Sequence, residues 1–192
     1  MASIQPVLSL LICTVPSRNG PMVSLYQKLD AQVRGRPVEI LTLLDNKTRT
    51  IGAKRNALLA ISRGEYVTYV DDDDDVMESY VDTLLAAIAE GPVDVITFPI
   101  RVTLDGSQEG VVRSSAFYEN EEYKPGQVTR RKPMYNSCWR RELIQDVRFG
   151  DMQYGEDAVF GQAAAPLVKT ECIIEGAPIY WYRWSETGTE AR

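Results

Sequence analysis

The chain has 192 residues, of which 44% are hydrophobic and 25% are charged, values that fit one globular domain. Its net charge of −6 argues against broad electrostatic capture of nucleic acid or an anionic membrane, although Arg130, Arg131 and Lys132 leave room for a local basic groove. The sequence contains no histidine, which excludes Ser-His-Asp and Cys-His catalysis and histidine-ligated zinc. A general base at neutral pH is therefore expected to be a carboxylate.

The start of the sequence is not expected to be a signal peptide. The start, MASIQPVLSL, lacks the basic region of a signal peptide, and no apolar run approaches the ~20 residues of a membrane span. The chain ends at Arg192, so we expect it to lack a C-terminal anchor. Cys13, Cys138 and Cys172 are odd in number and form no C-x-x-C pair, which predicts free thiols in a reducing cytoplasm.

The first part of the chain alternates between strands and helices. Pro6–Val15 is a continuous apolar run of strand length, as expected for a strand that is covered on both faces. A helix over Pro21–Val33, a strand over Val38–Leu44, a helix over Ile51–Ile61 and a strand after Gly64 are expected to follow. This order predicts an α/β fold with a mostly parallel central sheet and helices on both faces.

The second part of the chain is less regular. We expect a helix over Val76–Ala89, a strand over Val93–Ile100 and a hairpin that turns at Asp105 and Gly106. The polar segment Ser114–Pro133 is expected to be a long loop. The remaining predicted elements are a strand near Met134–Trp139, a short helix over Arg141–Val147, a helix over Glu156–Leu167 and one or two strands within Thr170–Trp184.

Five consecutive aspartates, Asp71 to Asp75, follow the predicted third strand in the stretch GEYVTYVDDDDD. Adjacent like charges repel by on the order of 1 kcal/mol per pair even in water-like surroundings. The C-terminal ends of strands in open α/β sheets are where ligands bind. A chain that keeps five carboxylates at such a place is expected to bring a cation there.

Three interpretations of these aspartates are open. A solvated acidic turn is the default for a charge run, but the apolar strand in front disfavours it. An EF-hand loop fits the spacing of Asp71, Asp73, Asp75 and Asp82, but Val76 stands where glycine is needed and the preceding segment is a strand. The best fit is a D-x-D site, in which alternate carboxylates hold Mg²⁺ or Mn²⁺ against the oxygens of a nucleotide diphosphate.

Four segments carry a family resemblance: TVPSRN from residue 14, LLDN from residue 43, GAKRNALLAISRGEYVTYVDDDD from residue 52 and WRRELIQDVRFGDMQYGEDAVF from residue 139. In order and spacing they resemble the nucleotide-sugar glycosyltransferases of the GT-A fold, in particular the inverting family 2. The resemblance implies a single Rossmann-like α/β sandwich. Residues 1–112 would form a nucleotide-sugar-binding half and residues 113–192 an acceptor and catalytic half.

The resemblance also implies roles for individual residues. Asp71 would contact the ribose, and Asp73 would bind the Mn²⁺ or Mg²⁺ that stabilises the departing nucleoside diphosphate. Asp157 would be the general base. The run of five leaves the register open, so Asp72, Asp74 or Asp75 would share these duties. The other residues implied to bind the nucleotide sugar are Thr14, Pro16, Arg18, Asp45, Arg55, Asp72, Glu156 and Arg183.

Several of these residues also have a purely structural interpretation. Asp45 precedes Asn46 and is equally suited to capping a turn. Arg55 would either meet the diphosphate or brace the aspartates, and its structural alternative is an ordinary surface arginine on a helix. Glu156 and Asp157 precede an apolar helical stretch, where acids stabilise the helix dipole.

The sequence therefore predicts a metal-dependent inverting glycosyltransferase that moves a sugar, expected from a UDP-sugar, to an acceptor hydroxyl. NKTRT follows Asp45 where the family carries an acid and a serine, which leaves the nucleobase open. The alternative is a non-catalytic nucleotide- or metal-binding module with the same fold. A sugar-nucleotide pyrophosphorylase is disfavoured because TVPSRNG lacks its glycine-rich motif. The acceptor and the oligomeric state stay open, with nucleic acid disfavoured as a partner by the acidic balance.

Overall fold

Strand β1, Leu8–Thr14, lies inside a six-stranded sheet, and all of its residues are buried. It pairs in parallel with β2, Val38–Leu44, and with β3, Tyr66–Tyr69. The computed structural model describes residues 5–185, so the expectations for the two ends of the chain lie outside the described residues. The three predicted strands are confirmed. β1 is buried along its whole length because it has a neighbouring strand on each edge and helices on each face.

The six-stranded sheet has the order β10-β5-β9-β3-β1-β2. Strand β9 runs antiparallel to both β3 and β5, and β10 runs parallel to β5, so only β9 is reversed in this sheet. The three strands span Val95–Thr97 (β5), Cys138–Arg140 (β9) and Glu171–Ile173 (β10). The predicted mostly parallel central sheet is confirmed.

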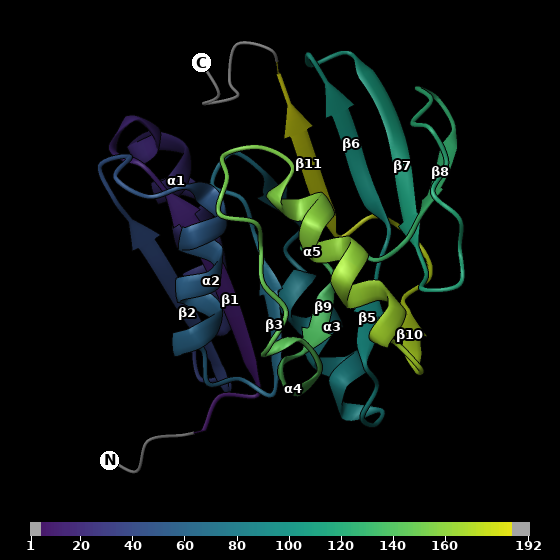
Figure 1. Cartoon of the computed structure of the whole chain (residues 1–192), viewed down its shortest axis with the longest axis horizontal. Coiled ribbons are helices and arrows are strands. Elements are labelled where there is room, and N and C mark those ends of the chain that lie inside the picture. Colours follow the sequence, from purple (N-terminus) through teal and green to yellow (C-terminus); the bar gives the residue numbers. More distant parts are fainter. Residues whose placement is uncertain (1–4, 186–192) are drawn as a thin grey trace.

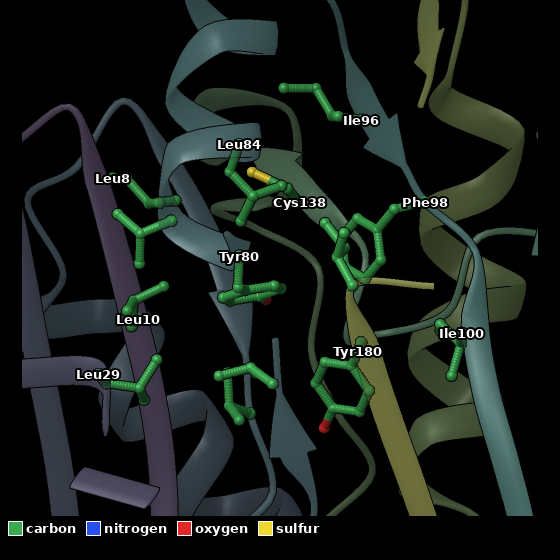
Figure 2. Packing of buried hydrophobic residues seen from close by; sticks show 14 of the residues in the cluster. Leu8, Leu10, Leu29, Tyr80, Leu84, Ile96, Phe98, Ile100, Cys138 and Tyr180 are labelled. Carbon is green, nitrogen blue, oxygen red and sulfur yellow. The ribbon is translucent and has the colours of Figure 1, made fainter. Parts of the chain in front are cut away.

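Helices cover both faces of this sheet (Figure 1). Because side chains alternate along a strand, Leu8, Leu10 and Ile12 of β1 pack on the face covered by helices α1 and α3. Figure 2 shows part of this cluster, with Leu8 and Leu10 near Leu29 of α1 and near Tyr80 of α3. These helices span Asn19–Val33 (α1) and Tyr80–Ala89 (α3).

The opposite face of β1 presents Leu11 and Cys13 to a second cluster, which includes Leu58 of α2 and Phe160 of α5. Phe160 stacks on Phe149 with ring centroids 4.3 Å apart. The elements on this side are α2, Ile51–Ile61, α4, Arg141–Ile144, and α5, Glu156–Ala164, which continues into a 3₁₀ turn at Ala165–Leu167. The predicted α2 has the observed bounds. The predicted helix to Leu167 changes to 3₁₀ geometry at Pro166, which has no N–H to continue the α-helical hydrogen bonds.

A second, five-stranded sheet has the order β4-β11-β6-β7-β8. Its strands span Asp75–Val76 (β4), Ile100–Leu104 (β6), Gln108–Ser114 (β7), Val128–Arg131 (β8) and Tyr180–Trp184 (β11). The hairpin between β6 and β7 turns at Asp105 and Gly106, both with positive φ, as predicted.

Three element predictions are wrong in the region of this second sheet. The predicted strand Val93–Ile100 breaks at Phe98 and Pro99, and the chain passes from the first sheet to the second, because proline has no N–H to continue the ladder. The predicted helix over Val76–Ala89 begins only at Tyr80, because Asp75 and Val76 pair with β11. The predicted loop Ser114–Pro133 contains β8, which pairs in parallel with β7. Within residues 5–185, no helix combines the length and the apolar character needed to cross a bilayer.

Gly52 lets α2 approach the segment that leads into α5. A Cβ atom at this position would lie 1.8 Å from the carbonyl oxygen of Gly150. We expect Gly52→Ala to lower the free energy of unfolding by about 1–3 kcal/mol, because a backbone carbonyl has to move. Gly20, also in a helix, has open space around it, so Gly20→Ala is the matched control and is expected to be neutral or stabilising. Chemical denaturation checks both variants, and equal stabilities would contradict the prediction.

Candidate functional site

The five aspartates form a turn at the C-terminal end of β3, and their side chains have different partners. The backbone N–H of Asp74 donates to the carbonyl oxygen of Asp71 at 3.1 Å and closes the turn. Asp72 and Asp74 are buried, whereas Asp71, Asp73 and Asp75 are partly exposed. Among residues 5–185, no three acidic or cysteine side chains converge to hold a metal ion by themselves. The disfavoured EF-hand interpretation therefore gains no support.

Arg55 of α2 connects Asp71 to Glu156 of α5. One guanidinium nitrogen donates to Asp71 Oδ1 at 2.9 Å and another to Glu156 Oε1 at 2.5 Å. The guanidinium also lies over the ring of Tyr135, whose hydroxyl donates to the other oxygen of Asp71. Burial disfavours the charge on Arg55, but Asp71, Tyr135 and Glu156 outweigh it and hold the Arg55 pKa well above its usual value. Arg55 is therefore buried against Asp71 and Glu156, and the alternative of an ordinary surface arginine is wrong.

Asp74 fixes the end of β11 against the aspartate turn. Its carboxylate accepts from the Tyr180 hydroxyl at 2.6 Å and from the Arg183 N–H at 2.8 Å. The Arg183 guanidinium donates to the carbonyl oxygens of Asp73, at 3.1 Å, and Asp74, at 2.7 Å. Burial, with repulsion from Asp71, raises the pKa of Asp74. Asp75 faces α1, where it pairs with Lys28 at 2.7 Å.

Arg18, in the turn after β1, pairs with two of the five aspartates, Asp72 and Asp73. Its guanidinium lies 2.6 Å from Asp72 Oδ1 and 2.9 Å from Asp73 Oδ2. Burial raises the pKa of Asp72, although Thr14 and Arg18 oppose the shift. Burial and the charge of Asp71 raise the pKa of Asp73 to about 6. The ionised form of Asp73 is thus disfavoured where it stands, and an additional cation would stabilise it.

Asp73 is the aspartate whose surroundings fit a divalent cation. Its side chain is 37% exposed, against 22% for Asp71 and 4% for Asp72. Both carboxylate oxygens of Asp71 already accept hydrogen bonds. Mg²⁺ and similar hard cations bind one or two carboxylates and complete their shell with phosphate oxygens and water. The donor set therefore fits a cation that Asp73 shares with a bound diphosphate, not one held by protein alone.

A cavity of about 320 Å³, the central cavity, lies between the C-terminal ends of β1 and β3, the start of α5 and the end of β11. It brings together most of the residues predicted from sequence: Thr14, Arg18, Arg55, Asp71, Asp72, Asp73, Glu156, Asp157 and Arg183. Its polar lining carries charges of both signs. Such a cavity can hold an anionic ligand against guanidinium groups while carboxylates face another part of it.

Glu156 and Asp157 differ in their surroundings although they are adjacent. Glu156 is buried and bonded to Arg55, and burial raises its pKa although Arg55 opposes the shift. Asp157 is partly exposed, and one of its oxygens accepts from the Ala158 N–H at 2.8 Å. Among residues 5–185, no lysine or arginine pairs with Asp157. Of the two acids, Asp157 is the one available to a ligand.

Two predicted site residues lie outside the lining of the central cavity. Pro16 begins a 3₁₀ turn and is exposed. Asp45 caps the loop after β2, where its Oδ2 accepts from the N–H groups of Thr48, at 3.0 Å, and Arg49, at 2.9 Å. Burial opposes ionisation, but hydrogen bonds from Lys54 and Thr48 lower the Asp45 pKa overall. The contacts of Asp45 are those of its turn-capping interpretation.

The sequence-based site prediction omitted several residues that line the central cavity, among them Lys54, Tyr135 and Tyr182. Lys54 is buried, lies 3.1 Å from Asp45 Oδ1 and donates to the Thr14 carbonyl oxygen at 3.3 Å. Its place beside Arg55 on a predicted helix was a usable signal. Tyr182 directly precedes the predicted Arg183, which was also a usable signal. Tyr135 had no local signal, because it reaches the cavity through long-range packing.

The model of the family described as glycosyl transferase family 2 matches residues 26–147 of the chain. The matched residues include the aspartate turn, whereas Arg18, Asp157 and Arg183 lie outside them. Among curated proteins, glycosyltransferase GlyA of Streptococcus pneumoniae serotype 4 is 25% identical over 156 residues, 73% of this chain and 22% of GlyA.

Among solved structures, S. aureus TarS 1–349 in complex with UDP-GlcNAc superposes with a TM-score of 0.67 and 16% identity, covering 95% of this chain and 60% of that one. The same protein in complex with UDP gives a TM-score of 0.66 and 18% identity over 93% and 60%. These likenesses show a shared fold. The chain spans 60% of these structures and about a fifth of the length of GlyA.

Proposed function

Because the chain belongs to glycosyl transferase family 2, we propose that it transfers a sugar from a nucleoside diphosphate sugar to an acceptor hydroxyl. One observation carries the proposal: the central cavity combines the carboxylate of Asp157, which no basic side chain of residues 5–185 neutralises, with the guanidinium groups of Arg18 and Arg183. A transfer of this kind needs a base for the incoming hydroxyl and positive charge for the departing diphosphate.

In the proposed reaction, Asp157 accepts the proton of the acceptor hydroxyl while the oxygen of that hydroxyl attacks the anomeric carbon of the donor sugar. The bond between that carbon and the diphosphate oxygen breaks, and the anomeric configuration inverts because attack and departure occur on opposite faces. Arg55 acts as a positioning residue that holds Asp71 and, through Glu156, the start of α5. Asp71 and Asp72 are proposed to contact the nucleoside end of the donor, near Thr14.

A UDP-sugar is the proposed donor, in line with the UDP-GlcNAc and UDP bound to the similar TarS structures. Arg18 and Arg183 are proposed to face its diphosphate. When bound, Mn²⁺ or Mg²⁺ would supply further positive charge there, and Asp73 would hold it. Pro16 and Asp45 would act through the loops that they shape. We also propose a cytoplasmic location, since all three thiols are free.

The two proposed halves of the chain meet at the central cavity. Arg183 belongs to residues 113–192, yet it donates to the backbone of Asp73 and Asp74 in residues 1–112. We propose that the second half therefore closes the donor site as well as supplying Asp157.

Titration of UDP and UDP-sugars into the protein, with and without Mn²⁺, tests the donor site. We expect Mn²⁺ to tighten UDP binding and Asp73→Asn to remove that gain, at least about tenfold in affinity, because one charge-assisted contact is worth roughly 1.5–3 kcal/mol. Asp75→Asn is the matched control from the same run, because Asp75 pairs with Lys28 away from the central cavity. Metal-independent binding in every variant would exclude Asp73 as a metal ligand, and no nucleotide binding at all would refute the donor proposal.

A further inference from the structure

A second cavity of about 240 Å³, the outer cavity, adjoins the central cavity. The two share Asp157 and Tyr135, and the other walls of the outer cavity come from the end of β8, the segment after it and α5. The two cavities therefore meet at Asp157 and Tyr135. Under the proposed function, this is where the part of an acceptor next to its reacting hydroxyl would lie.

The outer cavity is lined by two consecutive basic residues, Arg131 and Lys132. Arg131 is partly buried, and no carboxylate of residues 5–185 pairs with its guanidinium. Among residues 5–185, the one carboxylate that pairs with Lys132 is Glu119, at 3.8 Å, and the Glu119 side chain is 93% exposed. Such a surface pair contributes little. Removing a cation from water without a partner is unfavourable, so Arg131 and Lys132 together are suited to binding an anion.

The backbone holds these two residues toward the outer cavity. Along β8 burial alternates, with Thr129 buried and Arg130 exposed, so Arg131 faces inward again. The Lys132 N–H donates to Asn120 Oδ1 at 2.8 Å, which fixes the chain directly after the strand. Arg130 faces the other way, where it lies near Glu121 at 3.9 Å and over the Tyr118 ring at 5.6 Å.

We propose that the outer cavity binds an oxyanion, a phosphate or a carboxylate, that the acceptor carries close to its reacting hydroxyl. The guanidinium of Arg131 has the planar fork that matches either group, and Lys132 adds a second positive charge. The inference rests on the proposed function, because it takes Asp157 as the base that faces the acceptor. It names a substrate class, anionic acceptors, that the net charge of −6 does not suggest.

Binding of three small sugars tests this inference without requiring turnover. Ligand-observed NMR would compare glucose 6-phosphate, glucuronate and glucose with the wild-type protein and with Arg131→Gln, Lys132→Gln and Arg130→Gln. We expect at least one of the two anionic sugars to bind about tenfold or more tightly than glucose. Arg131→Gln should remove most of this preference, Lys132→Gln part of it, and Arg130→Gln none.

Comparing glucose 6-phosphate with glucuronate shows whether the outer cavity prefers a phosphate or a carboxylate. Equal binding of all three sugars to the wild type, or equal losses in Arg131→Gln and Arg130→Gln, would overturn the inference. A UDP titration on the same samples checks that each variant is folded and keeps its donor site. A wild type that binds UDP but shows no anion preference would refute this inference alone, whereas one that binds no nucleotide would refute the proposed function and this inference with it.

Discussion

Asp157→Asn is expected to lower the rate of sugar transfer by about 10²–10⁴-fold while leaving UDP binding within about twofold of wild type. The physical reason is that the amide cannot accept the acceptor proton at neutral pH, although it has the shape of the carboxylate. Asp157 lines the central cavity without an ion-pair partner among residues 5–185, so its removal disrupts no salt bridge there. Initial rates with a UDP-sugar and calorimetric titration of UDP measure the two effects separately.

The substitution should also leave the fold intact. The asparagine Oδ1 can still accept from the Ala158 N–H, as the carboxylate does at 2.8 Å. The loss of a negative charge at the start of α5 costs only about 0.3–1 kcal/mol. Asp146→Asn, at an exposed position outside both cavities, is the matched control for the change of charge. Parallel loss of transfer and UDP binding would argue against Asp157 as the base.

The elements that carry the donor site were predictable because their signals are local. β2 and α2 have the predicted bounds, since a short, mostly apolar strand and a helix bounded by Thr50 and Ser62 depend on neighbouring residues only. The second sheet was not predictable in the same way. β4 is a two-residue strand that exists because β11 pairs with it, and β8 lies in a polar segment whose partner is β7.

The same distinction applies to the aspartates. The order of the motifs predicted that Asp71 to Asp73 share one site. The hydrogen-bond partners and burial of each aspartate, however, depend on residues distant in the sequence. Tyr135 reaches Asp71 across 64 positions of sequence, and Tyr180 reaches the Asp71 N–H across 109. Asp74 is buried against Tyr180 and Arg183 because β11 packs there. The residues next to Asp74 in the sequence do not predict this burial. Which aspartate of the run faces the cavity and which is buried is therefore determined by tertiary contacts, not by the local sequence.

Arg55→Met is expected to lower the free energy of unfolding by about 3–5 kcal/mol at pH 8, more than Gly52→Ala does. Methionine keeps much of the volume of the side chain but leaves the carboxylates of Asp71 and Glu156 without the buried cation that bridges them. Arg34→Met is the matched control, because the Arg34 side chain is 76% exposed and its partner Asp30 is 40% exposed, so this pair lies at the surface. Such a pair is worth about 0–1 kcal/mol, so the control should unfold nearly as wild type does.

The pH dependence of that loss identifies its cause. Burial already raises the pKa of Glu156 although Arg55 opposes the shift, so removing Arg55 should raise this pKa further. A carboxyl whose folded-state pKa is raised destabilises the fold above that pKa and ceases to do so once it is protonated. The gap between wild type and Arg55→Met should therefore narrow from pH 8 to pH 5 in urea denaturation. A gap independent of pH would attribute the loss to packing against Tyr135, over whose ring Arg55 lies at 3.9 Å, and not to the unpaired carboxylates.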